Sequence, residues 1–468
     1  VFECSLQWCS IIDDSVESPE DLSLECVGSI CVYQWTPSRS GDYVMQLKTV
    51  KQSHTSPGSV VCDCVLFDAA SGSKMFGLFG IRFTNKFSKE DGDTLPILSC
   101  NWVKCEEISL STTARGMEQH CTLIVIDEIA LNDPIHTALQ QSLNVHCDAE
   151  VILASKLNQQ LVSASGRRFV VDCLTTRDNT VEELKKVFHA LQTLCFCADH
   201  ILVVCSDGAG STSGFESAVV GIIRSAQLEN TKIQFSLVCM DEHSNADEIM
   251  MLFLNNNFTD SEVCIRNNSI YRREYSAHCC NKPNTTTVDG TRPGAYIITG
   301  GLGGLGLLTA RVLVESRCCS DVVLVSRSGR VAYSGQGLED DLSWLLNEQL
   351  SSGVSIHIVR CDVSDEMSVI GMLSDVRSSC GSIIGIVHAA GVLRDGLLRG
   401  GGALDGFDNV WCSKASSGLY LHEHTVDDDL DNFICFSSIT AAVGNPGQCV
   451  YGAANSYLDH LMSVRASS

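Results

Sequence analysis

Hydrophobic and polar positions follow three different patterns along the chain. As far as residue 95, short apolar runs are separated by turn-forming residues, a pattern typical of β-strands. It predicts strands over residues 29–35, 41–48, 60–67 and 75–83. The polar run 85–94 follows, and we expect it to be a linker.

Apolar strands and amphipathic helices alternate between residues 98 and 275. The expected strands span 121–127, 150–154, 169–173, 201–205 and 233–238, and the expected helices span 181–195 and 216–227. This alternation predicts a Rossmann-like, doubly wound α/β half. Residues 128–133, after its first strand, include no glycine that would admit a phosphate, so we expect this half to be structural and free of cofactor.

A second linker is expected over residues 278–293. It contains His278, Cys279 and Cys280, which invite comparison with a zinc site. Adjacent cysteines cannot easily face one tetrahedral ion, and no second pair of ligands follows nearby. We therefore predict no metal site.

The alternation of strands and helices restarts at residue 294. Strands are expected over 295–298, 321–325, 354–359, 383–388 and 432–437, and helices over 307–316, 340–350, 367–376 and 404–424. The pattern predicts a second doubly wound parallel sheet.

A glycine-rich loop joins the first strand of this second sheet to its first helix. Gly300, Gly304 and Gly306 have the spacing Thr-Gly-x-x-x-Gly-x-Gly. Glycines there let backbone N–H groups and a helix N-terminus approach a pyrophosphate without obstruction by Cβ atoms. The loop therefore predicts a dinucleotide site formed by Thr299, Gly300, Gly301, Leu302, Gly303, Gly304 and Leu305.

Residues at the ends of the next strands indicate which dinucleotide is expected. Arg327, with Ser328, follows the second strand, where an arginine accommodates a ribose 2′-phosphate and an acidic residue would favour NAD. We therefore expect NADPH as the cofactor. Cys361, Asp362 and Val363 end the third strand beside the expected adenine, and Ala389, Ala390 and Gly391 leave room after the fourth.

Composition narrows the class of protein. A formal net charge of −24 argues against a nucleic-acid partner, because no basic stripe exists to neutralise phosphates. Many of the 25 cysteines lie inside apolar runs, where cysteine behaves as a small hydrophobe, so we expect a reducing, cytoplasmic location. No signal peptide and no apolar run long enough to insert in a membrane is visible.

The motifs of the last segment resemble the short-chain dehydrogenase/reductase superfamily, and more closely the ketoreductase domain of polyketide synthases and animal-type fatty acid synthases. The stretches that carry the resemblance are Thr299 to Gly306, Ser326 to Gly329, His388 to Asp395, Phe436 to Ser438, Pro446 to Asn455 and Tyr457 to Asp459.

The resemblance implies a catalytic set of Lys414, Ser438, Tyr451 and Asn455. Tyr451 would donate a proton to a carbonyl oxygen, Lys414 would supply the adjacent positive charge, and Ser438 would hydrogen-bond the carbonyl. Most of the superfamily has Tyr-x-x-x-Lys, whereas asparagine stands at position 455 here. The ketoreductase family exchanges these two positions, so Lys414 with Asn455 completes the set.

The same resemblance implies a stereochemical outcome. Asp395, in Leu393-Arg394-Asp395, fits the pattern of ketoreductases that give the 3R alcohol, and Gln448 stands where enzymes that give the 3S alcohol carry tryptophan. Arg394 replaces the aspartate often found there. Asp395 as a simple turn residue before Gly396 is the alternative.

The resemblance extends more weakly towards the N-terminus. Residues 1–95 are similar to the C-terminal part of a dehydratase double hot-dog, residues 96–285 to the cofactor-free structural half of a ketoreductase, and residues 286–468 to the catalytic half. The family continues beyond the equivalent of residue 468 with further strands and a lid, so we expect this chain to be a C-terminally truncated piece of a longer protein.

The function implied is NADPH-dependent reduction of a β-ketoacyl thioester to a β-hydroxyacyl thioester. The implied partners are an acyl carrier protein bearing the phosphopantetheine-linked chain and other synthase domains, in a homodimeric parent. The alternatives are a stand-alone short-chain alcohol dehydrogenase and a non-catalytic scaffold.

Overall fold

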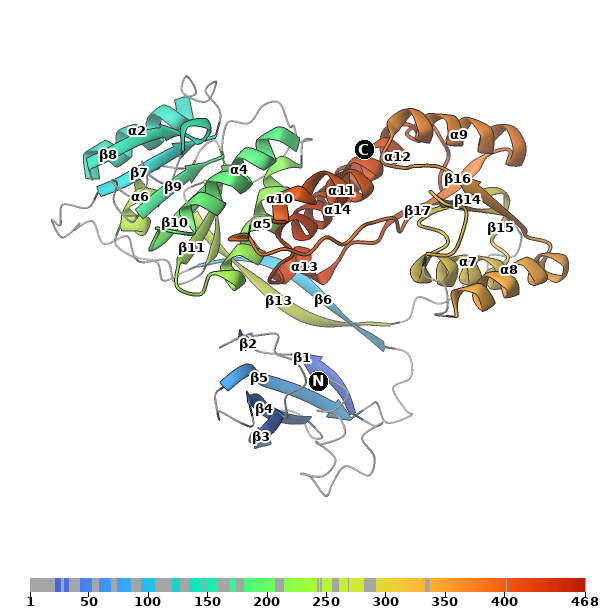
Figure 1. The fold of residues 1–468 in the computed structure, drawn as a ribbon, viewed down its shortest axis with the longest axis horizontal. Helices are drawn as coiled ribbons and strands as arrows, with labels where there is room; N and C mark the ends of the chain where they lie inside the picture. The colour runs from blue at the N-terminus through green and yellow to red at the C-terminus, as the bar shows by residue number, and fades with distance from the viewer. Residues whose placement is uncertain are drawn as a thin grey trace. The chain divides into compact units, whose positions relative to one another are not determined.

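The protein divides into two compact units, Val1–Leu98 with Ala277–Thr285 and Ser99–Ser276 with Thr286–Ser468 (Figure 1). The computed structural model describes residues 22–26, 29–32, 43–52, 59–68, 74–85, 94–105, 120–126, 134–146, 148–157, 168–173, 181–206, 214–241, 244, 246–254, 261–267, 269–281, 292–332, 337–400 and 402–467. The glycine-free stretch 128–133 and most of the two expected linkers lie outside this set.

The first unit contains an antiparallel sheet with the order β1-β5-β4-β3, and β2 also pairs with β5. Its strands are β1 (Leu22–Cys26), β2 (Ser29–Val32), β3 (Tyr43–Gln52), β4 (Ser59–Asp68) and β5 (Lys74–Asn85). The four strands expected from the sequence are present. β1 was not expected from the sequence. The hot-dog assignment of this unit stays a prediction.

Most of an eight-stranded sheet, of order β6-β13-β12-β11-β10-β9-β7-β8, belongs to the second unit. The strands are β6 (Thr94–Lys104), β7 (His120–Val125), β8 (Asp148–Leu153), β9 (Arg168–Asp172), β10 (His200–Ser206), β11 (Gln234–Met240), β12 (Glu262–Arg266) and β13 (Ser269–Asn281). The pairs from β8 to β12 are parallel, and β12 pairs with β13 antiparallel. The linker expected from residue 278 is therefore wrong at its start, because β13 continues to Asn281.

Helices cover both faces of this sheet, as a doubly wound fold requires. α4 (Val181–Leu194) and α5 (Phe215–Glu229) pack on the face that includes Val171 and Val203. α2 (Pro134–His146) and α6 (Ala246–Leu254) pack on the face of Val170 and Leu202. Successive residues of each strand thus enter opposite cores.

The second sheet has five parallel strands in the order β16-β15-β14-β17-β18. They are β14 (Arg292–Thr299), β15 (Cys319–Ser326), β16 (Ser355–Arg360), β17 (Ile383–His388) and β18 (Asn432–Cys435). The order reverses beside β14, which is the topological switch point where α/β sheets bind ligands. The Rossmann-like fold expected from the sequence is confirmed.

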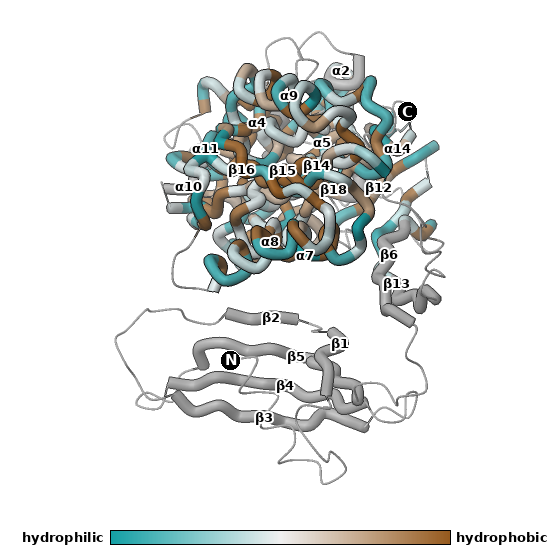
Figure 2. The backbone as a smooth tube through the Cα atoms, turned by 90° about the vertical axis from the view of Figure 1, so that its right-hand side faces the viewer, coloured by the Kyte–Doolittle hydropathy of each residue, from teal (hydrophilic) through white to brown (hydrophobic). Residues whose placement is uncertain are grey.

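Two layers of helices enclose this sheet. α7 (Gly304–Ser316) and α8 (Leu338–Ser352) lie on one face and α9 (Glu366–Cys380) on the other, with the most hydrophobic strand residues between them (Figure 2). Tyr296 and Ile298 face α7, whereas Ala295 and Ile297 face α9. None of the helices in the described ranges is long and apolar enough to cross a membrane.

The single helix expected over residues 404–424 is wrong in detail. The structure has α10 (Gly402–Asp405), α11 (Phe407–Trp411), a π-helical turn (Cys412–Ser416) and α12 (Ser417–Glu423). An apolar pattern cannot distinguish a continuous α-helix from one with a π turn. Such turns are frequent at functional sites, and this one carries Lys414.

Candidate functional site

The glycine loop begins directly at the end of β14, at the switch point of the second sheet. Gly300 has a φ of +64°, a left-handed conformation that residues with a side chain rarely adopt. A Cβ at Gly300 would lie 2.8 Å from the Ala389 carbonyl oxygen, and one at Gly301 would lie 2.8 Å from Leu324 Cα. A Cβ at Gly306 would likewise collide with the backbone of Gly300 and Gly301. These three positions require glycine for packing within the protein.

The outer side of the same loop is open. Gly304 and Leu305 are exposed at the first turn of α7, and Leu305 keeps 54% of its surface accessible. A Cβ at Gly304 would meet only Leu338 Cδ2, at 3.9 Å. Leu302, in contrast, is buried beneath the loop, so its side chain belongs to the core. The loop thus presents exposed backbone at a helix N-terminus, which fits a pyrophosphate.

Residues at the ends of β15 and β16 lie next to this loop. The Gly301 amide donates to the Val325 carbonyl at 3.0 Å, which ties the loop to the start of the Arg327 turn. Arg327 and Ser328 are exposed there. Arg360, which the sequence reasoning did not select, pairs in register with Ser326, and a Cβ at Gly329 would lie 2.9 Å from its Cγ. Two arginines therefore border the position expected for a 2′-phosphate.

The expected adenine-side residues divide into core and surface. Cys361 and Val363 are buried against α9, whereas Asp362 is exposed. An Asp362 carboxylate oxygen accepts hydrogen bonds from the Ser364 amide at 3.1 Å and its hydroxyl at 2.6 Å. Asp362 is thus the residue of the three whose side chain can contact a nucleotide.

A buried histidine connects the glycine loop to the lysine. His388 Nδ1 lies 2.7 Å from Thr299 Oγ1, and its Nε2 lies 2.9 Å from the Lys414 carbonyl oxygen and 3.1 Å from Ser417 Oγ. Burial lowers the pKa of His388 to about 4, so the ring is neutral at physiological pH. The sequence placed His388 in a motif but did not reveal this bridge, because its partners lie on three separate elements.

Lys414 is buried in the π-helical turn, and its ammonium is directed at the tyrosine. Its Nζ donates to the Phe436 carbonyl at 2.8 Å and lies 5.4 Å from the centroid of the Tyr451 ring. Burial lowers the pKa of Lys414 to about 8. A Cβ at Gly391 would lie 3.6 Å from Nζ, so the expected small residue borders this lysine.

Tyr451 and Asn455 lie one turn apart on α14 (Cys449–Ser467), as their spacing predicts. Asn455 Nδ2 donates to the Tyr451 carbonyl at 2.7 Å. The Asn455 side-chain oxygen is buried and accepts no hydrogen bond from the described residues.

Ser438 is the N-cap of α13 (Ile439–Val443), and its hydroxyl oxygen accepts from the Thr440 amide at 3.2 Å. This bond leaves the hydroxyl proton free to be donated elsewhere. The two residues expected to control stereochemistry contact one another, since Gln448 Nε2 donates to both carboxylate oxygens of Asp395 at 3.1 Å.

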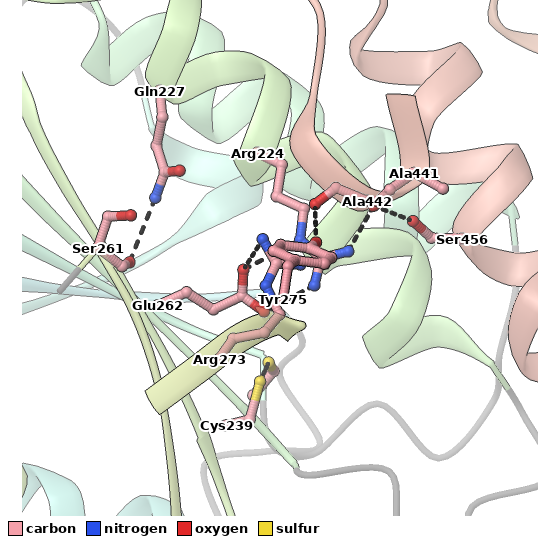
Figure 3. Close-up of polar contacts among 11 residues, drawn as sticks. Arg224, Gln227, Cys239, Ser261, Glu262, Arg273, Tyr275, Ala441, Ala442 and Ser456 are labelled. Atoms are coloured by element: carbon pink, nitrogen blue, oxygen red, sulfur yellow. Dashed lines mark hydrogen bonds and ion pairs between the residues drawn. The ribbon is translucent and has the colours of Figure 1, made fainter. Parts of the chain in front are cut away.

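Side chains of α5 and β13 contact α13 from outside. Arg224, on α5, donates to the Ala441 carbonyl at the end of α13 and to Glu262 at 2.7 and 3.0 Å (Figure 3). Tyr275 donates to the Ala442 carbonyl at 2.8 Å. Figure 3 shows these side chains reaching from α5 and the sheet to the α13 carbonyls. α13 is thereby fixed at both ends, by Ser438 and by these two side chains.

Comparison with known proteins agrees with this geometry. The model of the KR domain family matches residues 294–468. Polyketide synthase PksN of Bacillus subtilis is 30% identical over 61% of this chain, and polyketide synthase GfsA of Streptomyces halstedii is 31% identical over 55% of it. The matched parts are 5% and 3% of those relatives' lengths.

Solved structures show the same fold. A structure of A-type ketoreductases from a modular polyketide synthase matches with a TM-score of 0.64 and 24% identity, covering 79% of this chain and 80% of that one. A ketoreductase domain from the bacillaene assembly line matches with a TM-score of 0.57 and 23% identity, covering 80% and 81%. The expected resemblance to a preceding dehydratase stays a prediction. Residues 294–468, which contain the glycine loop, Lys414 and Tyr451, are therefore similar to the KR domain family, and the fold is that of ketoreductases from polyketide synthases.

Proposed function

We propose that the second unit reduces a β-ketoacyl thioester, carried on an acyl carrier protein, to a β-hydroxyacyl thioester with NADPH. The observation that carries the proposal is the position of Lys414 Nζ, 5.4 Å from the centre of the Tyr451 ring. Tyr451 lies on α14, the helix that also holds Asn455. This arrangement lies in a domain whose glycine loop has an open face at a helix N-terminus.

In this proposal each residue has one chemical task. Ser438 donates a hydrogen bond to the substrate carbonyl and polarises it. Tyr451 transfers its hydroxyl proton to that oxygen as the C=O double bond becomes a C–O single bond. The Lys414 ammonium stabilises the phenolate that remains, and Asn455 orients this turn of α14. NADPH, when bound, supplies the hydride that the carbonyl carbon receives.

The fit to the dinucleotide rests on the glycine loop, Arg327 and Asp362. Gly300 to Leu305 would hold the pyrophosphate, Arg327 with Ser328 the 2′-phosphate, Asp362 the adenine, and Ala389 to Gly391 the nicotinamide side. We also propose the 3R product, on the strength of Asp395 and its contact with Gln448.

The rest of the chain is assigned on resemblance. We propose residues 1–95 as the C-terminal part of a dehydratase, 96–285 as the structural half and 286–468 as the catalytic half. The parent is proposed to be a homodimeric, cytoplasmic synthase that supplies the carrier and the other domains.

The test is a spectrophotometric assay of NADPH consumption with a β-ketoacyl pantetheine thioester, on a chain that includes the whole ketoreductase domain. Tyr451→Phe should lose nearly all turnover and keep its NADPH affinity within about threefold. Tyr420→Phe, a tyrosine of α12 packed beside the α9 core, is the matched control and should keep turnover. If the unmodified chain binds no NADPH, the protein is a non-catalytic scaffold. Substantial turnover by Tyr451→Phe would refute the proposed role of Tyr451.

A further inference from the structure

One carboxylate of the structural half binds two loops of the catalytic half. Glu229 is the last residue of α5. Its Oε2 accepts a hydrogen bond from the Leu398 amide at 2.6 Å, and its Oε1 accepts one from the Gly447 amide at 2.9 Å. The Cys449 thiol also donates to Oε1, at 3.2 Å. These partners are 169, 218 and 220 residues away along the chain.

The two loops that Glu229 binds are those of Asp395 and Gln448. The Gly396 amide donates to the Gly447 carbonyl at 2.8 Å, so the loops also bond to each other between the two Glu229 contacts. Leu398 is fully buried in the core that α4 and α5 form, and the Arg399 guanidinium lies 5.0 Å from the centre of the Phe196 ring. The loop of Asp395 therefore packs against the structural half through Leu398 and Arg399.

The thiol next to this carboxylate is held in its protonated form. Burial and the neighbouring Glu229 raise the pKa of Cys449 well above its ordinary value. Cys449 thus remains a donor, and the carboxylate group of Glu229 receives three donors with its two oxygens. An amide in its place could accept on one side only, because its NH2 group would face a backbone N–H.

We propose that Glu229 is a positioning residue that sets the separation of the Asp395 and Gln448 loops and thereby the orientation of the acyl substrate. It acts through the Leu398 and Gly447 amides, which it binds directly. The effect on reduction rests on the proposed function, whereas the effect on the loops does not.

The experiment compares Glu229→Gln with Gln227→Ala. Gln227 lies on the same helix but bonds the Ser261 carbonyl at 3.3 Å, away from the catalytic loops, which makes it the matched control (Figure 3). Hydrogen exchange measured by mass spectrometry should show peptides containing Leu398 and Gly447 exchanging at least tenfold faster in Glu229→Gln. α14 should keep its protection, and Gln227→Ala should match the unmodified chain.

Kinetics then separates positioning from general damage. KM for the β-ketoacyl thioester should rise at least fivefold and the ratio of 3R to 3S product should change, while the Kd for NADPH stays within twofold. Unchanged exchange of the Leu398 and Gly447 peptides, or faster exchange spread equally over α5 and α14, would overturn the proposal. If the unmodified chain reduces no ketoacyl thioester, the proposed function fails, and the exchange data alone decide the role of Glu229.

Discussion

At the scale of single residues, the charge of Lys414 links burial to reactivity. An ammonium so deeply buried loses hydration, which lowers the pKa of Lys414 to about 8. The same buried position places that charge 5.4 Å from the Tyr451 ring centre. Burial of Lys414 therefore both lowers its pKa and places its positive charge beside Tyr451.

The lowered pKa of Lys414 predicts how the rate of reduction depends on pH. Turnover should fall as pH rises through about 8, because Lys414 loses its proton there, whereas an unburied lysine would stay charged to about pH 10. Lys414→Arg keeps a charge at every accessible pH, so any turnover it retains should show no such decline. The measurement is kcat from pH 6.5 to 9.5. A flat profile for the unmodified chain would contradict this role of Lys414.

His388 predicts a second pH dependence, this one in stability. Its pKa is about 4 in the folded chain and about 6.5 when unfolded, so the unfolded state binds a proton first as pH falls. The stability is fully present above about pH 6.5 and is lost progressively towards pH 4, by about 3 kcal/mol at most. Urea unfolding at pH 7 and 4.5 should show a smaller difference in free energy for His388→Asn than for the unmodified chain. An equal difference in both would show that His388 titrates alike in the folded and unfolded states.

Sequence spacing predicted the contacts of this site that lie within one helix, but it could not predict contacts between distant segments of the chain. Tyr451 and Asn455 are four residues apart, so a helix alone brings them together. Lys414 came from a family motif. Glu229 carries no motif, and its partners become neighbours only when two separate sheets are assembled. Contacts between distant segments are not encoded in local periodicity.

At the scale of elements, the strand–loop–helix unit of β14 and α7 was predicted well, because each part has a local signal. A short, continuously buried apolar run marks the strand, and the glycine spacing marks the turn. The break of the 404–424 helix had no such signal. The π turn that exposes the Lys414 carbonyl to His388 is instead stabilised by contacts with β17.

The glycine loop and the turn after β15 make a prediction about cofactor choice. Arg327→Asp should weaken NADPH binding at least tenfold and leave NADH binding within threefold, since it removes the 2′-phosphate partner and adds a repelling charge. Arg360→Ala, at the end of the neighbouring strand, should weaken NADPH alone and by less. Fluorescence titration with both nucleotides measures this. A native preference for NADH would refute the assignment of Arg327.

At the scale of the whole second unit, the two halves approach each other closely where α5 crosses α14. A Cβ at Gly221 would lie 2.5 Å from the Gly452 carbonyl oxygen and 2.7 Å from Ser456 Oγ. Gly452 follows Tyr451 directly. The half built on the eight-stranded sheet therefore supports the backbone that carries the tyrosine, in addition to holding α13 through Arg224 and Tyr275.

The close contact of α5 with α14 predicts that a larger residue at position 221 lowers both stability and turnover. Gly221→Ala should lower the free energy of unfolding by about 1–3 kcal/mol, because the added methyl group has no space and the helices must separate. Turnover should fall with it, since Tyr451 moves with α14. Gly371→Ala is the matched control: Gly371 is inside α9, nothing lies within 4 Å of its added Cβ, and the change should stabilise by about 0.5–1 kcal/mol. Urea unfolding and the reductase assay measure both variants. If Gly221→Ala behaves like Gly371→Ala, the helices have room to spare and the structural half does not fix the position of Tyr451.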